Sequence, residues 1–256
     1  MTQFDPSWPQ DWSTIYDAMD IDRTLHLNFY TSLISAGTGS LLDLGCGTGS
    51  ITVAIADSMD SGTRVVGVDL SPKMIEIARS RAPHYSWLVG DICAPPVEGR
   101  FDLIVICFHT LQALVENVQL HQAFYAIANL LTPTGRFAFD IYQPNLDWLG
   151  SIGPAPYVAR RYTDPDGRRI DVIEQNGRYD ADSRILSGEW TLRDSATGEP
   201  IKIAPIVQRV RQYFPEDIDV ALAHAGMHWV GRFGELDRRP LEPGSKRQVY
   251  ICARDG

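Results

Sequence analysis

The sequence has few features of secreted, metal-binding or membrane proteins. Its four cysteines form no Cys-x-x-Cys pair and its six histidines do not cluster, which argues against a structural zinc site and favours reduced thiols. No apolar run approaches the ~20 residues of a membrane span. The first residues also lack the basic and apolar regions of a signal peptide. We therefore expect a cytoplasmic protein that binds neither a metal nor a membrane.

Positive charge is also scarce. Lysine and arginine number 23 against 32 aspartates and glutamates, which gives a net charge of −9. The paired arginines, such as Arg168-Arg169 and Arg238-Arg239, lie among acidic or turn residues, a pattern typical of a solvated surface. Because no basic stripe is present for a phosphate backbone, we expect no nucleic-acid partner.

Strand and helix patterns alternate through the first part of the chain. Residues 101–108 form a nearly unbroken apolar run, as expected of a central parallel strand that is buried on both faces. Ser71 and Pro72 predict the start of a helix, with serine as the N-cap and proline at the first helical position. This alternation predicts an α/β, doubly wound, mostly parallel sheet with helices on both sides.

The pattern changes near residue 145. Between 157 and 211, apolar and polar residues alternate, and we interpret the pairs Asp166-Gly167, Asn176-Gly177 and Thr197-Gly198 as turns. This favours three or four antiparallel strands, after which a helix near 215–225 and two strands resume the core. We predict three parts: N-terminal lid helices at 1–40, a core of 41–144 with 212–256, and an antiparallel substrate cap at 145–211.

The most informative stretch is the glycine-rich turn that ends at Gly49. The apolar run from Leu41 enters three glycines at alternate positions, and a helical apolar pattern follows. Glycines in a strand-to-helix turn remove every Cβ, so that a ligand can lie against the main chain. Twenty residues after Gly49, Asp69 ends a second buried strand, where a carboxylate binds a ribose diol in doubly wound sheets.

Two nucleoside cofactors compete for this turn. A dinucleotide site needs the spacing Gly-x-Gly-x-x-Gly, whereas the spacing here is Gly45-x-Gly47-x-Gly49. Asp43 stands two residues before the first glycine, where a carboxylate suits a cofactor with an ammonium group and a cation better than a pyrophosphate. A nicotinamide- or flavin-dependent enzyme is therefore the weaker alternative.

Residues 41–141 resemble the class I S-adenosylmethionine (SAM)-dependent methyltransferases, motif by motif. The resemblance implies a seven-stranded Rossmann-like sheet and SAM as cofactor, with S-adenosylhomocysteine as product. Near the N-terminus, Ile15-Tyr16-Asp17 resembles the lid element whose tyrosine closes over the cofactor carboxylate. The positions expected to bind the cofactor are Tyr16, Tyr30, Asp43, Gly45, Cys46, Gly47, Asp69, Leu70, Met74, Asp91, Ile92 and Cys107.

The pattern from Tyr162 to Gly234 resembles the bacterial small-molecule methyltransferases of secondary metabolism that place an antiparallel sheet over the active site. It implies N-methylation of a compact metabolite, such as an amino sugar or an azapteridine-like heterocycle. O-methylation of a phenol or hydroxyl and a non-catalytic SAM-binding regulator are the alternatives. His109 follows the central strand and is the candidate base. Trp12, Tyr142 and Trp190 are, with His109, the expected acceptor contacts in a monomer or homodimer.

Overall fold

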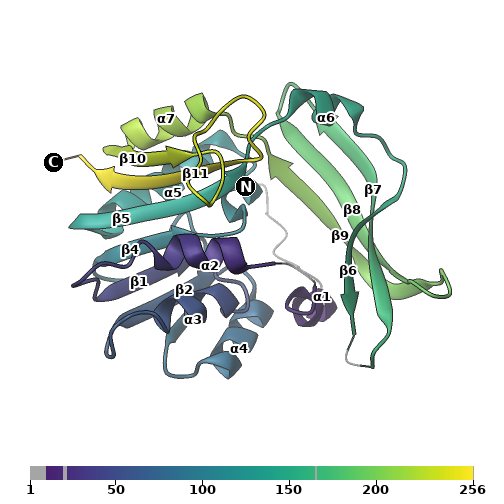
Figure 1. Ribbon diagram of the computed structural model, residues 1–256, viewed down its shortest axis with the longest axis horizontal. Helices are drawn as coiled ribbons and strands as arrows, with labels where there is room; N and C mark the ends of the chain where they lie inside the picture. Colours follow the sequence, from purple (N-terminus) through teal and green to yellow (C-terminus); the bar gives the residue numbers. More distant parts are fainter. Residues whose placement is uncertain (1–9, 20–21, 165, 256) are drawn as a thin grey trace. The chain divides into compact units, whose positions relative to one another are not determined.

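The computed structural model describes residues 10–19, 22–164 and 166–255 (Figure 1). The chain divides into two compact units. The larger unit comprises residues 23–144 and 212–256, and the smaller one comprises the described parts of 1–22 and 145–211. No helix in the described ranges is long and apolar enough to cross a membrane.

The larger unit is built on a mixed seven-stranded sheet with the order β10-β11-β5-β4-β1-β2-β3. Its strands are β1 (Ser40–Leu44), β2 (Arg64–Asp69), β3 (Ser86–Val89), β4 (Phe101–Ile106), β5 (Leu131–Tyr142), β10 (Met227–Phe233) and β11 (Arg247–Arg254). The first five strands are parallel, whereas β11 pairs antiparallel with both β5 and β10. The predicted seven-stranded Rossmann-like sheet is therefore confirmed.

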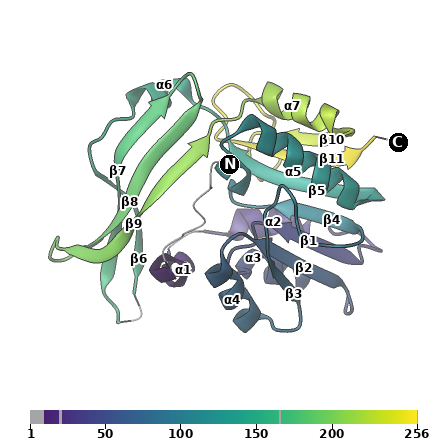
Figure 2. The same ribbon diagram turned by 180° about the vertical axis from the view of Figure 1, so that it is seen from behind.

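Helices cover both faces of this sheet. They are α2 (Thr24–Thr31), α3 (Ser50–Ala56), α4 (Pro72–Arg81), the 3₁₀ turn η1 (Thr110–Ala113), α5 (Asn117–Leu130) and α7 (Pro215–His224). Figures 1 and 2 show α2 on one face of the sheet and α5 on the other. Helix α4 begins as predicted, because the Ser71 hydroxyl accepts a hydrogen bond from the Met74 N–H and Pro72 occupies the first turn.

The central strand β4 contributes to two separate cores. Ile104 and Ile106 pack into the cluster that contains α5 and α7, while Leu103 and Val105 pack into the cluster that contains α2 and α3. Successive strand residues point to opposite faces of a sheet. The unbroken apolar run of the sequence is thus a strand that is buried on both sides.

Helix α2 belongs to the larger unit. Phe29 and Tyr30 are buried in the same cluster as Ile51 of α3 and Val105 of β4. Of the residues 1–40 that we expected to form a lid, those from Arg23 onward therefore pack as part of the sheet unit. A lid role for the preceding helix remains a prediction.

The smaller unit is an antiparallel sheet of four strands with two short helices. Its elements are α1 (Gln10–Tyr16), α6 (Leu146–Ser151), β6 (Tyr157–Thr163), β7 (Arg169–Asp180), β8 (Ile185–Asp194) and β9 (Pro200–Arg211). The strand order follows the chain, β6-β7-β8-β9. Trp12 of α1 is fully buried against Leu192 and Ile206, and its indole N–H donates to the Ala204 carbonyl over 2.8 Å.

One predicted turn is wrong. Asn176 and Gly177 lie inside β7, where the register with β8 shifts between Gln175 and Arg178 as a β-bulge. The turn between β7 and β8 instead occupies residues 181–184. Asn176 has a φ of 56°, and both turns and bulges select asparagine and glycine for such backbone angles. The dipeptide therefore cannot distinguish the two structures by itself.

Candidate active site

The sheet reverses its strand order between β1 and β4, the point at which open α/β sheets bind their ligands. The glycine loop leaves β1 there, and the segment 107–110 leaves β4. Gly45 has a φ of 78°, and a Cβ at this position would lie 2.3 Å from Cγ2 of Thr110. The two loops therefore meet only because Gly45 has no side chain.

The glycine loop leaves room for a ligand at its centre. Gly47 has a φ of 55°, and a Cβ built there would have no heavy atom within 4 Å. Its N–H donates to Oδ2 of Asp69 over 2.9 Å, and the Ser71 N–H donates to Oδ1 of the same carboxylate, also over 2.9 Å. Asp69 thus ties the loop after β1 to the start of α4, and burial raises the pKa of its carboxyl group.

Asp43 is buried beneath this loop on β1. The Thr52 hydroxyl donates to its Oδ2 over 2.6 Å. Its Oδ1 is buried and has no hydrogen-bond partner in the described part of the chain. Burial raises the pKa of Asp43 to about 7. A buried carboxylate oxygen that lacks a donor fits a cofactor that carries an ammonium group.

The positions expected to flank the adenine lie at the ends of β2 and β3. Met74 and Ile92 are buried, Leu70 is half-buried, and Asp91 is exposed, with Oδ1 accepting a hydrogen bond from the Cys93 N–H over 2.8 Å. Cys46 is buried within the glycine loop. The structure brings these residues to one edge of the sheet, and their contacts with the cofactor remain a prediction.

His109 lies at the end of β4 in an unusual backbone conformation. Phe108 and His109 have φ values of 55° and 61°, in the left-handed region that residues other than glycine rarely adopt. The His109 imidazole stacks on Tyr142 at the end of β5, with the ring centroids 3.6 Å apart. Its Nδ1 lies 3.3 Å from Oδ2 of Asp140.

Asp140, which we did not predict, is the centre of this group. The carboxylate is fully buried on β5. Tyr30 donates its hydroxyl to Oδ1 over 2.7 Å, and the Phe108 N–H donates to the same oxygen over 3.2 Å. His26 Nε2 lies 3.4 Å from Oδ2. Burial alone would raise the pKa of Asp140, but the charges of His109 and His26 and the hydrogen bond from Tyr30 lower it well below its usual range.

Two of the predicted contact residues are fully buried in the structure. The Tyr30 hydroxyl donates to Asp140 and to the Ile106 carbonyl, and its contact with a cofactor carboxylate remains a prediction. Trp12 is fully buried in the core of the smaller unit, and its contact with the acceptor remains a prediction. Cys107 is a buried thiol of the α2–α3 cluster, and burial raises its pKa. Tyr16 and Trp190 are half-buried in the smaller unit, and their roles remain predictions.

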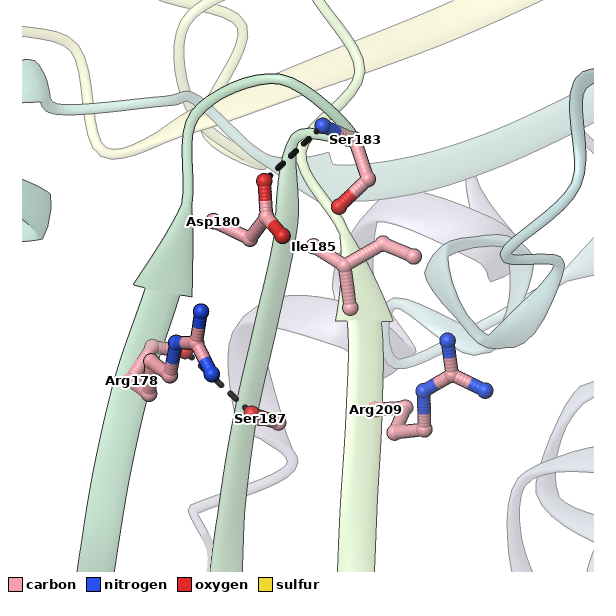
Figure 3. Close-up of a pocket in the computed structure, with 6 residues that line it drawn as sticks. All are labelled: Arg178, Asp180, Ser183, Ile185, Ser187 and Arg209. Carbon is pink, nitrogen blue, oxygen red and sulfur yellow. Dashed lines mark hydrogen bonds between the residues drawn. The ribbon is translucent and has the colours of Figure 1, made fainter.

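The smaller unit has a shallow hollow of its own on β7, β8 and β9 (Figure 3). It measures about 130 Å³ and is lined by Arg178, Asp180, Ser183, Ile185, Ser187 and Arg209. Ser187 pairs with Arg178 on one side and with Arg209 on the other, so these three form one cross-strand row. None of the residues that line this hollow is a predicted site residue. Among the residues that the structure describes, no three histidine, cysteine or acidic side chains are grouped to hold a metal ion.

Comparison with known proteins identifies the class. Residues 41–135 match the model of a methyltransferase domain. The chain is 34% identical over 180 residues to a demethylmenaquinone methyltransferase of Tropheryma whipplei, a match that covers 60% of this chain and 72% of the relative. It is 39% identical over 113 residues to a 2-phytyl-1,4-naphtoquinone methyltransferase of Thermosynechococcus vestitus, covering 42% of this chain and 48% of the relative.

Solved structures show the same fold along nearly the whole chain. A SAM-dependent methyltransferase from Clostridium acetobutylicum superposes with a TM-score of 0.78 at 22% identity, covering 96% of this chain and 98% of that one. The amino pentose methyltransferase CalS10 of Micromonospora echinaspora gives 0.71 at 20% identity, covering 97% and 98%. The sugar N-methyltransferase KedS8 of a Streptoalloteichus species gives 0.72 at 20%, covering 96% and 93%.

The chain therefore belongs to the methyltransferase family. The matched region covers 55%, 39%, 50% and 44% of four further curated relatives. The chain thus spans about half the length of these relatives.

Proposed function

We propose that this chain transfers a methyl group from SAM to a nitrogen of a small metabolite, an amino sugar or a heteroaromatic compound. The observation that carries this proposal is the His109–Asp140 pair at the switch point of the sheet, beside the glycine loop. An amine arrives protonated at neutral pH, so its methylation requires a group that takes a proton. The structural similarity to amino pentose and sugar N-methyltransferases supports the same acceptor class.

The residues at the ends of β1, β2 and β3 would hold the cofactor. The free oxygen of Asp43 would accept the ammonium group, and Asp69 the ribose hydroxyls. Gly47 offers its open main chain to the ligand, and Asp91 would take the adenine amino group. When bound, SAM supplies a methyl group on a positively charged sulfur, which an oriented nucleophile can attack directly.

The residues at the ends of β4 and β5 would serve the acceptor. His109 takes the proton of the incoming ammonium group, and the Asp140 carboxylate compensates the positive charge that the imidazole gains. The exposed ring of Tyr142 covers one face of this imidazole. We further propose that residues 145–211, with α1, select the acceptor.

O-methylation of a phenol or hydroxyl is the second candidate. Its support is the relatedness to two enzymes that are named for quinone substrates, together with the flat, half-exposed Tyr142 ring. The net charge of −9 supports the expectation that no nucleic acid is bound. We expect a monomer or homodimer in the cytoplasm.

Incubation with methyl-labelled SAM and paired acceptors tests the proposal. The pairs should differ only in an amino against a hydroxyl group on the same sugar or heterocycle, with mass spectrometry of the products. Label on the amino member supports N-methylation. Label on the hydroxyl member alone supports the second candidate. SAM binding without transfer to any acceptor in the panel or to a metabolite extract would instead indicate a regulator.

A further inference from the structure

The Asp140 carboxylate lies close to residues from widely separated parts of the sequence. His26 and Tyr30 come from α2, Phe108 and His109 follow β4, and Arg247 lies on β11 with its Nε 3.8 Å from Oδ2. We propose that Asp140 is a positioning residue that holds Nδ1 of His109, so that Nε2 is the nitrogen that receives the acceptor proton. This inference rests on the proposed function and assigns a role to a residue outside the cofactor motifs.

Two imidazoles share Oδ2 of Asp140, and their exposure separates their roles. The His26 side chain is 4% exposed and stacks on Phe108 with centroids 3.9 Å apart. The His109 side chain is 13% exposed. The His26 ring is enclosed between Asp140 and Phe108 and stabilises the carboxylate, whereas His109 is the more exposed of the two rings. Asp140 therefore joins a buried histidine to an accessible one.

The same carboxylate also holds the backbone of the left-handed turn. The Phe108 N–H donates to Oδ1 of Asp140, and Nδ1 of the His109 ring lies 3.3 Å from Oδ2. Each oxygen of the carboxylate thus contacts one of two consecutive residues. Two neighbouring residues with positive φ persist only where surrounding contacts fix them. Two residues along β5 from Asp140, Tyr142 stacks on the His109 ring. Asp140 and Tyr142, both on β5, thus fix the position and tilt of the His109 ring. Asp140 also determines which ring nitrogen faces the carboxylate.

The proton transfer balances without any further reactant. The acceptor ammonium loses a proton, Nε2 of His109 gains it, and Nδ1 keeps its own proton toward Asp140. The cation so formed faces Asp140, while the other charged or titratable groups around the carboxylate are His26, Tyr30, Cys107 and Arg247. Arg247 is itself bound to Glu235 over 3.0 Å. The carboxylate is consequently the anion that the imidazolium contacts.

Long-range ¹H–¹⁵N NMR of the intact wild-type protein tests the positioning without any acceptor. We expect the neutral His109 ring to carry its proton on Nδ1. A ring protonated on Nε2 would overturn the proposal. This result does not depend on the atom that is methylated, so that failure of the positioning and failure of the proposed N-methylation can be told apart.

Asp140→Asn tests the charge. We expect turnover to fall about 10²-fold and the acidic limb of the pH–kcat profile to move to lower pH by about one unit or more, because the imidazolium loses its anion. S-adenosylhomocysteine affinity should stay within about twofold of wild type. Asp102→Asn is the matched control, since Asp102 binds Ser40 and Thr132 near the other edge of the sheet. Equal loss of turnover in both variants with an unmoved pH profile would reduce Asp140 to a structural role. Should Asp140→Asn fail to fold, the tautomer measured in the wild type decides the question.

Discussion

Two buried carboxylates on the same sheet have opposite electrostatic environments. Asp43 on β1 has one hydroxyl donor and one oxygen that no described residue contacts by a hydrogen bond, and burial raises its pKa to about 7. Asp140 on β5 accepts hydrogen bonds from a tyrosine and a backbone N–H, and two histidines lie beside it. These contacts lower the pKa of its carboxyl group. Asp43 thus lacks the cation that Asp140 already has within the protein.

In the proposed function, this difference separates the carboxylate that would bind the cofactor from the one that would serve the acceptor. A carboxylate that is desolvated but unpaired gains most from a ligand that carries a positive charge. A carboxylate that already has hydrogen-bonding and charged partners within the protein instead holds those side chains in position. In the proposed methyl transfer, cofactor binding and acceptor chemistry would therefore use the same residue type for opposite purposes.

The largest expected effect is on the Asp140 side. His109→Ala should lower turnover by about 10²–10⁴-fold if the imidazole acts as the base, while SAM affinity stays unchanged. Steady-state kinetics and calorimetry on the same preparation check both quantities. The exposed His228 on β10 provides a control, since His228→Ala should leave turnover unchanged. Turnover and KM of His109→Ala within about twofold of wild type would mean that positioning alone carries the transfer.

A change at Asp43 should have opposite effects on the free and the bound protein. The folded-state pKa of about 7 exceeds the unfolded value of 3.8. Folded protein therefore binds a proton that unfolded protein does not, and this contribution to stability is lost as the pH rises from about 4 to 7. Asp43→Asn should raise the stability of the free protein at pH 8 by up to about 1.4 kcal/mol for each unit of pKa shift. Chemical denaturation across this pH range measures the slope.

The same variant should lose affinity for the cofactor, because an amide cannot pair with an ammonium group. SAM affinity of the wild type should rise as the pH increases through 7, since ionised Asp43 binds the cation. Calorimetry at pH 6 and pH 8 checks this. A pH-independent affinity that Asp43→Asn reproduces would place the ammonium group elsewhere.

Asp69→Ala should have an intermediate effect. It removes a charge-assisted hydrogen bond to the ribose diol, worth about 1.5–3 kcal/mol. Calorimetry with SAM measures the loss, and Asp60→Ala, at an exposed position before β2, is the control. Because Asp69 also accepts from Gly47 and Ser71, thermal unfolding of the free variant must be compared. Unchanged SAM affinity would remove Asp69 from the site.

Tyr142→Ala should have the smallest effect. It removes a stacked ring from His109, an interaction worth about 0.5–1.5 kcal/mol. We expect a rise of a few fold in the acceptor KM, with SAM affinity unaffected, in steady-state assays. Tyr125→Ala, at an exposed position on α5, is the control. A larger fall in kcat than rise in KM would show that the ring acts on the imidazole rather than on the acceptor.

The sequence indicates the glycine loop and Asp69 more directly than the group of residues around Asp140. The residues from Asp43 to Asp69 form a local pattern, since glycine spacing and strand ends can be recognised within about 30 residues. Asp140 meets His26, His109 and Arg247, which come from three separate parts of the chain. The rule that parallel strands end at one edge, which identified Asp69, also applies to Asp140 beside β4. The full burial of Tyr30 and Trp12 was not predicted, because residue type alone does not show whether an aromatic side chain is buried.

The contact between Gly45 and Thr110 limits how such an enzyme can change its substrate over evolutionary time. One added carbon at Gly45 would collide with Thr110, and a larger residue at 110 would press on the glycine loop. Mutations in this turn would therefore disturb both the glycine loop and the segment that carries His109, and selection would remove most of them. New acceptors should accordingly arise through changes in residues 145–211, which lie outside the glycine loop and strand β5.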